Sequence, residues 1–382
     1  MHIAIVNHEY PPVGGGAATA SYQTARALCS MGHQVTVITA AVANRPAREI
    51  HDGVVVERIF ALRTATFAPS SVELLSFCAA CQLGLRRRLK RLGVEGVIAY
   101  FAVPAGYFAV KAARSLGVPA VLSLRGSDVP GFKLGRLEGI FGTLAKPLVR
   151  HTLHQAGIVA PNSEVLRRLT LAFAPEIRTK IRVIANGIEV PVIDRAASSN
   201  TGELHIIQVG QLIPRKRVDV TLAAIDLLAA RGVRAKATLV GDGPLRAQLA
   251  ALAQTRGIGD RVRFLGRRPR AEILALLRCH DVFVMTSAAE GMSNALLEAM
   301  ASGLPIVTTD NGSDDLVTRA DCGVVIGQGD AHALADQLQR FSAAPELRNR
   351  FAKNGLKSAR QMTWPACARG FIEALADAAA QR

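Results

Sequence analysis

Aromatic residues are scarce in this sequence, and their scarcity limits what the chain can bind. Only 5% of the 382 residues are Phe, Trp or Tyr, with a single Trp. Proteins that read single-stranded nucleic acid stack bases on aromatic side chains, and no base-reading motif appears in the chain. A basic nucleic-acid-binding protein is therefore the last alternative we consider, despite a formal charge of +16.

Cysteine is also rare, with six residues spread over the chain. So few cysteines in a chain of this length do not form a disulfide framework. Cys78 and Cys81 have the spacing of a redox or metal pair, but no second pair accompanies them, and we interpret them as buried cysteines of a helix. His151 and His154 lie one helical turn apart with no further ligand, so no metal site is expected there.

No apolar run is long enough to cross a membrane. The longest nearly uncharged stretch, residues 96–110, contains Pro104 and is shorter than the ~18 residues that a spanning helix requires. The chain opens on a strand-like segment, so we expect no signal peptide. The expected location is the cytoplasm, either in solution or peripherally at the inner face of the cell membrane.

Acidic residues are outnumbered, most strongly in the first half. Residues 1–190 contain 22 Lys and Arg against 11 Asp and Glu, whereas the rest contains 24 against 19. Basic surface attracts nucleic acid, anionic lipid or phosphorylated substrates. Residues 86–91 place five cations at the end of a predicted helix, which suits either a cap of the helix C-terminus or contact with an anionic membrane.

Strand and helix patterns alternate along nearly the whole chain, which predicts mainly parallel, doubly wound sheets. The periodicity is lost over residues 190–203, where small polar residues indicate a linker. A chain of 382 residues is long enough for two domains, and we predict them over residues 1–189 and 204–361.

The most informative stretch is residues 281–303, where an apolar strand enters a turn ending at Glu290 and a helix begins near Ser293. Open α/β sheets bind ligands at the carboxyl ends of strands, and a helix N-terminus suits an anion. A carboxylate repels phosphate, so Glu298 and Glu290 suit neutral hydroxyls, such as those of a ribose or a sugar. The alternative is that both are ordinary surface glutamates.

Two further loops follow predicted strands. The first ends in Gly14, Gly15 and Gly16, which allow a ligand to approach the backbone and permit positive φ, although a plain flexible turn is the alternative. The second carries Arg215 and Lys216. A guanidinium fork and an ammonium group can both bind a diphosphate, and we favour this role over the alternative of a solvated basic loop.

Glu290 and Glu298 have seven residues between them, and they occur together with Gly291, the run Glu298–Ala301 and residues 303–305 (Gly-Leu-Pro). This pattern resembles the signature of family 4 retaining glycosyltransferases with the GT-B fold. Further similarities lie at Asn186-Gly187-Ile188, at Arg215-Lys216 and in the turn that begins at Gly241. Gln211 and Arg217 depart from the family pattern, which usually has arginine and glycine at these two positions. So does Arg125, which stands where the family usually has histidine in His-Gly-x-Asp.

The resemblance implies two Rossmann-like domains that face each other across a cleft, with residues 362–382 completing the first. It implies that Glu290, Arg215 and Lys216 are catalytic, and that Arg125 and Asp128 contact the acceptor or the sugar. The implied donor-binding residues are Gly15, Gly16, Gly241, Gly291, Met292, Ser293, Asn294 and Glu298.

The implied reaction moves a hexosyl group from a UDP- or GDP-sugar, with retention, to a glycan, polyprenyl-linked or lipid acceptor in cell-envelope or polysaccharide biosynthesis. No metal or other cofactor is expected, because cations and a helix dipole can neutralise the leaving diphosphate. An anionic membrane surface is a further expected partner, and nucleic acid is not. The alternative is a nucleotide-sugar epimerase of the same fold, which would convert the donor alone.

Overall fold

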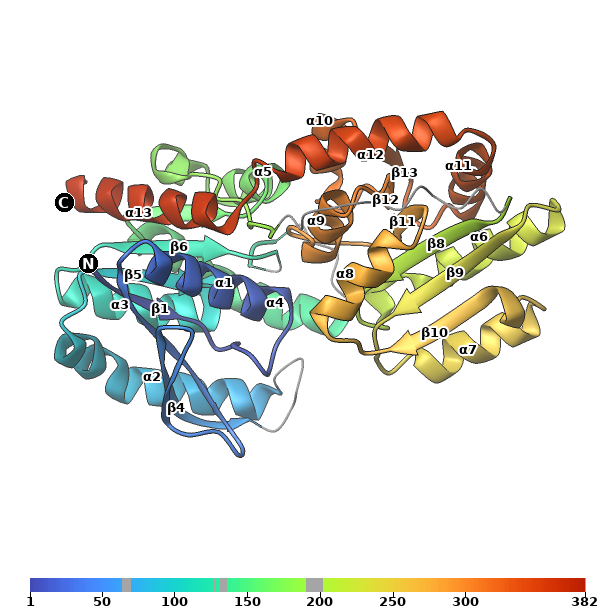
Figure 1. Cartoon of the computed structure of the whole chain (residues 1–382). Helices are drawn as coiled ribbons and strands as arrows, with labels where there is room; N and C mark the ends of the chain where they lie inside the picture. Colours follow the sequence, from blue (N-terminus) through green and yellow to red (C-terminus); the bar gives the residue numbers. More distant parts are fainter. Residues whose placement is uncertain (64–69, 127, 131–135, 190–201, 382) are drawn as a thin grey trace. The chain divides into compact units, whose positions relative to one another are not determined.

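A computed structural model describes residues 1–63, 70–126, 128–130, 136–189 and 202–381 (Figure 1). The chain forms two compact units, one of residues 1–187 with 363–382 and the other of residues 188–362. Of the predicted linker, residues 190–201 lie outside the described residues. The two units are therefore described separately.

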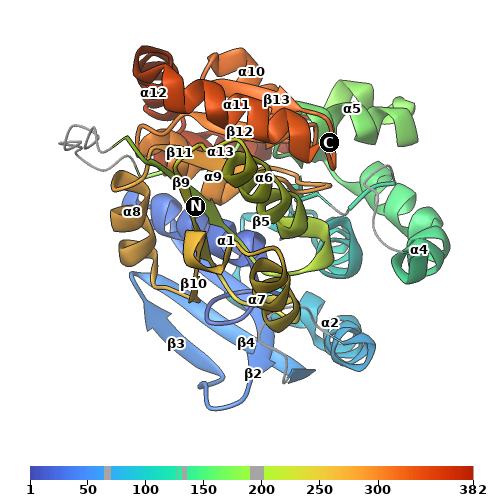
Figure 2. The ribbon, with the colours of Figure 1, turned by 90° about the vertical axis from the view of Figure 1, so that its right-hand side faces the viewer.

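The first unit is built on a seven-stranded sheet in the order β3-β4-β2-β1-β5-β6-β7. Every neighbouring pair is parallel except β3 and β4, which are antiparallel. Figure 2 shows β3, β4 and β2 together at one edge of this sheet. The strands are β1 (His2–Val6), β2 (Gln34–Val42), β3 (Arg48–His51), β4 (Val54–Arg63), β5 (Gly96–Tyr100), β6 (Ala120–Leu124) and β7 (Ile158–Pro161). The helices are α1 (Gly16–Ser30), α2 (Ser71–Leu92), α3 (Tyr107–Ser115), α4 (Arg136–Gln155), α5 (Glu164–Phe173) and α13 (Trp364–Ala380).

Helices cover both faces of this sheet because successive strand residues point to opposite faces. In β1, Ala4 and Val6 pack with helices α2, α3 and α4, whereas Ile3 and Ile5 pack with α1 and α13. The last helix of the chain therefore belongs to the core of the first unit. Gly187 lies so close to it that a Cβ there would be 2.2 Å from the Trp364 amide nitrogen.

The second unit contains a six-stranded parallel sheet in the order β10-β9-β8-β11-β12-β13. Helices again cover both faces, and two apolar clusters form its core. The strands are β8 (Leu204–Val209), β9 (Ala235–Val240), β10 (Val262–Gly266), β11 (Val282–Met285), β12 (Ile306–Thr309) and β13 (Gly323–Ile326). The helices are α6 (Val218–Ala230), α7 (Arg246–Thr255), α8 (Arg270–Arg278), α9 (Asn294–Ala301), α10 (Asp314–Ala320), α11 (Ala331–Ala343) and α12 (Pro345–Ala359).

The predicted α/β class with two doubly wound sheets is confirmed. The edge strand β3 was not predicted, since it is only four residues long and its side chains are mostly exposed.

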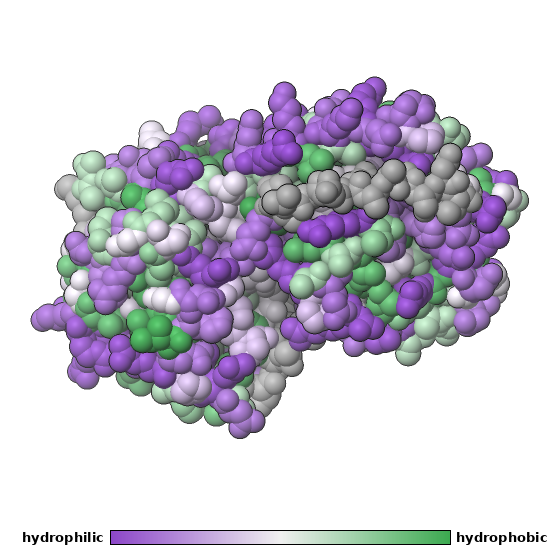
Figure 3. Space-filling view, viewed as in Figure 1, coloured by the Kyte–Doolittle hydropathy of each residue, from purple (hydrophilic) through white to green (hydrophobic). Residues whose placement is uncertain are grey.

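Hydrophilic side chains predominate on the face seen in Figure 3. Among the described residues, no helix combines the length and the apolar character needed to cross a membrane.

The basic run 86–91 has specific partners in the structure. Arg88 and Arg91 both reach the buried carboxylate of Glu57 on β4, at 2.7 and 3.0 Å. The Gly93 N–H caps the end of α2 in a left-handed conformation. Part of the cationic run is therefore held on the fold, whereas Arg87 and Lys90 remain exposed.

Candidate functional site

The strand order of the second unit places the candidate site. Counted along the chain within this unit, the order is 3-2-1-4-5-6, so β8 and β11 are neighbours at the point where the winding reverses. Ligands of open α/β sheets lie at this point, beyond the carboxyl ends of the two strands. The loop after β8 carries Arg215 and Lys216, and the loop after β11 carries Glu290. The topology therefore brings together three residues that the sequence singles out separately.

Hydrogen bonds to backbone carbonyls hold these two loops together. The Ala288 N–H donates to the Arg215 carbonyl at 2.8 Å, and the Thr286 hydroxyl donates to the Arg217 carbonyl at 2.8 Å. Arg217 has φ and ψ of 45°, a left-handed conformation that glycine adopts at little cost. This geometry accounts for the glycine that the resembled family usually carries at position 217.

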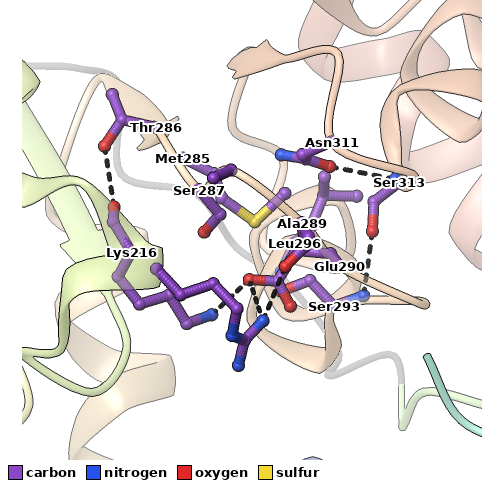
Figure 4. A network of polar contacts seen from close by, with 12 residues as sticks. Lys216, Met285, Thr286, Ser287, Ala289, Glu290, Ser293, Leu296, Asn311 and Ser313 are labelled. Atoms are coloured by element: carbon purple, nitrogen blue, oxygen red, sulfur yellow. Dashed lines mark hydrogen bonds and ion pairs between the residues drawn. The ribbon is translucent and has the colours of Figure 1, made fainter. Parts of the chain in front are cut away.

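Arg215 and Lys216 converge on the carboxylate of Glu290, and Figure 4 shows Lys216 beside this carboxylate. Lys216 Nζ lies 2.7 Å and Arg215 Nη1 lies 3.3 Å from Glu290 Oε1. Burial alone would raise the pKa of Glu290, but the charges of Lys216 and Arg215 outweigh it and hold the pKa below its usual value. Glu290 is therefore ionised at neutral pH, and its charge faces two partly buried cations.

The N-terminus of α9 lies directly after this cluster, as predicted. Ser293 is its N-cap, because the Ser293 hydroxyl accepts a hydrogen bond from the Leu296 N–H at 3.4 Å. The loop after β12 supports the turn: the Glu290 N–H donates to the Asn311 carbonyl at 2.5 Å, and the Ser293 N–H donates to the Ser313 hydroxyl at 3.2 Å. Of the other predicted donor contacts in this run, Gly291 is buried and Met292 and Asn294 are half-buried.

Glu298 is buried in α9 and forms an ion pair that the sequence did not predict. Arg270, the first residue of α8, lies 2.9 Å from Glu298 Oε1 through Nε and 2.7 Å from Glu189 Oε2 through Nη1. Burial raises the pKa of Glu298, and the charge of Arg270 only partly offsets that rise. Arg270 therefore positions the carboxylate that is predicted to hold hydroxyls.

We expect Arg270→Gln to destabilise the protein by about 2 kcal/mol at pH 8, because it leaves the buried Glu298 carboxylate without its cation. The pKa of Glu298 in the folded state would rise further above its unfolded value. The folded state then loses stability as pH rises from the unfolded pKa of Glu298 to its folded pKa. The destabilisation caused by Arg270→Gln should therefore be smaller at pH 5 than at pH 8. Urea unfolding at both pH values measures it.

The control for this experiment is Glu189→Gln. Glu189 is the more exposed partner of Arg270, with 53% of its side chain accessible, so its loss should cost less than about 1 kcal/mol. Equal destabilisation by Arg270→Gln at the two pH values would show that the charge of Glu298 is not involved.

Gly241, a predicted donor contact, has a structural reason to be glycine. Its φ is +139°, and a Cβ there would lie 1.9 Å from the Gly210 carbonyl oxygen. Its N–H donates to the Gly266 carbonyl at 2.9 Å. The residue therefore allows β8, β9 and β10 to end close together at the edge where the site lies.

The glycine loop of the first unit follows β1. Gly14 has φ of +98°, whereas Gly15 is the N-cap residue of α1 and Gly16 is its first residue. The Gly15 N–H donates to Glu9 Oε2 at 3.3 Å, so a carboxylate of the chain contacts the backbone of this loop. A Cβ on Gly15 would meet no atom within 4 Å, which leaves the backbone open to a ligand.

Arg125 and Asp128 follow β6 of the first unit, with Ser127 outside the described residues. The Asp128 carboxylate accepts hydrogen bonds from the Ala102 N–H, at 2.7 Å, and from the Arg125 N–H. The Arg125 guanidinium lies 4.2 Å from the Tyr100 ring centroid and donates to the Asn186 side chain. Both side chains thus have structural contacts, and their roles toward a sugar stay predictions.

Sequence reasoning missed Arg270, Asn311 and Ser313. The basic run Arg267-Arg268-Pro269-Arg270 at the end of β10 was an available signal for Arg270, because it also follows a strand of the same sheet. No local signal marks Asn311 or Ser313, which act through a neighbouring strand. In the part of the chain that the structure describes, no three His, Cys, Asp or Glu side chains gather as metal ligands would.

Comparison with known families identifies the class of protein. Residues 14–190 match the model described as Glycosyltransferase Family 4, and residues 190–358 match the one described as Glycosyl transferases group 1. The chain therefore belongs to the family 4 glycosyltransferases, as the motif around Glu290 and Glu298 indicated.

Among individual relatives, the chain is similar to the GDP-mannose-dependent alpha-mannosyltransferase of Mycobacterium tuberculosis strain CDC 1551. The two are 29% identical over 381 residues, which cover 96% of this chain and 93% of the relative. Sucrose-phosphate synthase from Thermosynechococcus elongatus superposes with a TM-score of 0.80 at 21% identity, over 98% of both chains. Anabaena HepE in complex with UDP-glucose superposes with a TM-score of 0.78 at 17% identity, over 98% of this chain and 99% of HepE. These structures confirm the GT-B fold.

Proposed function

We propose that this glycosyltransferase moves a hexosyl group from a UDP- or GDP-sugar to a glycan, polyprenyl-linked or lipid acceptor, with retention of anomeric configuration and without a metal ion. The observation that carries the proposal is the convergence of Arg215 and Lys216 on Glu290 beside the N-terminus of α9. The named donors of two similar proteins support it, since one is GDP-mannose-dependent and the other was solved with UDP-glucose.

The geometry suits departure of a nucleoside diphosphate. In the reaction, the bond between the anomeric carbon and the phosphate oxygen breaks, and the acceptor oxygen forms the new bond to that carbon while its proton passes to the departing diphosphate. Negative charge grows on the diphosphate, where Arg215, Lys216 and the positive end of α9 can meet it. In this proposal Glu290 contacts the sugar hydroxyls, and Glu298 holds the ribose. No side chain is assigned as a nucleophile.

A ligand screen followed by product analysis tests this function. Binding raises the melting temperature as ligand concentration exceeds Kd, so one of UDP-, GDP- and ADP-sugars should stabilise the protein. NMR of the product should show the anomeric configuration of the donor. An epimer formed from donor alone would favour the epimerase instead. Activity that is abolished by a chelator and restored by Mg²⁺ would contradict the metal-free reaction, and turnover unchanged by Glu290→Ala and Arg215→Ala would remove the site.

A further inference from the structure

A pocket lies on the first unit between helices α3 and α4, and the residues that line it have no role in the proposed reaction. Its volume is about 330 Å³, which is at the lower end of the range for small-ligand sites. Residues spaced three and four apart on each helix share a face, so each helix presents a row of side chains to the pocket. The lining includes Tyr107, Lys111, Arg114 and Ser115 of α3 and His151 and Gln155 of α4.

Among the described residues that line this pocket, none is acidic, so its positive charge has no acidic counterpart there. Helix α3 contains no Asp or Glu, and neither do residues 145–155, the part of α4 whose side chains the structure describes. Lys111 Nζ has a neutral partner, Gln82 Oε1, at 3.4 Å. Glu176 is already paired, with Arg150 at 2.8 Å and His154 at 2.6 Å.

Two further cations lie close to the same pocket. Arg86 Nε donates to the Ser115 hydroxyl at 3.0 Å, which brings the basic end of α2 to the end of α3. Lys180 Nζ donates to the Ala156 carbonyl at 2.9 Å, just after α4. Burial lowers the pKa of Lys180, and the charge of Arg114 lowers it further. Arg114 and Lys180 therefore repel each other, and an anion between them would relieve the repulsion.

The remaining wall suits the carbon skeleton of a ligand. Lys111 Nζ lies 5.7 Å from the centroid of the Tyr107 ring, and the His151 ring lies 6.1 Å from it. An aromatic ring beside a cation offers an apolar surface next to a phosphate-binding group. A lysine and an arginine one turn apart can both donate hydrogen bonds to the oxygens of one phosphate.

We propose that this pocket binds a phosphomonoester, with Lys111 and Arg114 on the phosphate oxygens and Tyr107 against the attached carbon skeleton. The phosphate can belong to a soluble molecule or to the headgroup of a membrane lipid. The recognition chemistry is the same for both sources. None of the residues that line the pocket belongs to the predicted donor site, so the proposal stands or falls independently of the proposed reaction.

The test uses the full chain carrying Arg215→Gln, Lys216→Gln and Glu290→Gln, so that the donor cations do not contribute to phosphate binding and no buried carboxylate is left without its cations. Glycerol 3-phosphate is titrated by calorimetry. Flotation with vesicles of phosphatidylcholine and phosphatidic acid, in a four-to-one ratio, tests the lipid source. Adding Lys111→Gln and Arg114→Gln should weaken binding of at least one probe by about tenfold or more.

The matched control adds Arg168→Gln and Arg369→Gln instead, which remove two exposed cations from α5 and α13 of the same unit. This control should bind both probes as the parent does, and melting temperatures without ligand should agree among all three proteins. Binding of glycerol 3-phosphate alone would assign a soluble ligand, and binding of vesicles alone would assign a lipid. The proposal is overturned if the parent binds neither probe, or if the control loses as much binding as the pocket variant.

Discussion

Lys216→Gln should lower kcat for transfer from the nucleotide sugar by about 100- to 1,000-fold, the usual effect of removing one charge-stabilising group. Lys216 is the less exposed of the two cations that face Glu290, with 14% of its side chain accessible, so water screens its charge little. Arg217→Gln is the matched control, because Arg217 pairs with Asp219 at 3.0 Å instead. That control should change kcat by less than about twofold. Release of nucleoside diphosphate in a coupled assay measures both.

A second variant separates catalysis from folding. Lys216→Gln also deprives the buried Glu290 of one cation, which should cost about 2 kcal/mol in the free energy of unfolding. The double variant Lys216→Gln/Glu290→Gln removes both charges and should regain much of this stability without regaining turnover. If turnover returned together with stability, Lys216 would act only on the fold.

Gly241→Ala should lower the free energy of unfolding by about 3–5 kcal/mol, because it combines a strained positive φ with a severe overlap. The new methyl group would lie 1.9 Å from the Gly210 carbonyl oxygen and 2.8 Å from its carbonyl carbon, which are backbone atoms directly after β8. Urea unfolding measures the effect. A loss below about 1 kcal/mol would mean that the ends of β8 and β9 can separate at little cost.

Gly15→Ala is the matched glycine variant with the opposite expectation. Its methyl group would meet no atom within 4 Å and its φ is −119°, so stability should change by less than about 0.5 kcal/mol. If phosphates approach this backbone, the KM for the donor should nevertheless rise by about tenfold, which corresponds to about 1.4 kcal/mol of binding. An unchanged KM would mean that the glycine loop is a plain turn.

Much of the fold could be predicted because parallel strands buried on both faces read as continuous apolar runs. β11, Val282–Met285, is such a run, and its four residues are buried. β3 gave no comparable signal, since its sequence Arg-Glu-Ile-His is mostly polar. The strand lies at the edge of the sheet and pairs only with β4. Its pairing with β4 depends on the tertiary structure rather than on its own pattern.

The site could be predicted where its residues share one local run. Glu290 and Ser293 belong to the same turn, so strand and helix signals placed them together. The pairing of Arg270 with Glu298 spans 28 positions, and no spacing rule distinguishes Arg270 from the other arginines of its loop. Lys216 and Glu290 were each singled out, the first for a diphosphate and the second for a sugar. Their direct contact was not predicted, because it depends on β8 and β11 being neighbours.

The place of α13 in the core of the first unit constrains how the protein is made. During synthesis, residues 1–187 leave the ribosome long before residues 363–382, so the face of the sheet carrying Ile3 and Ile5 is covered by α1 but not by α13 until the chain is complete. The second unit is complete earlier, although it is encoded later than most of the first. A chain that ends before Thr363 would therefore lose a core helix of the first unit, whereas the second unit would keep all of its helices and strands.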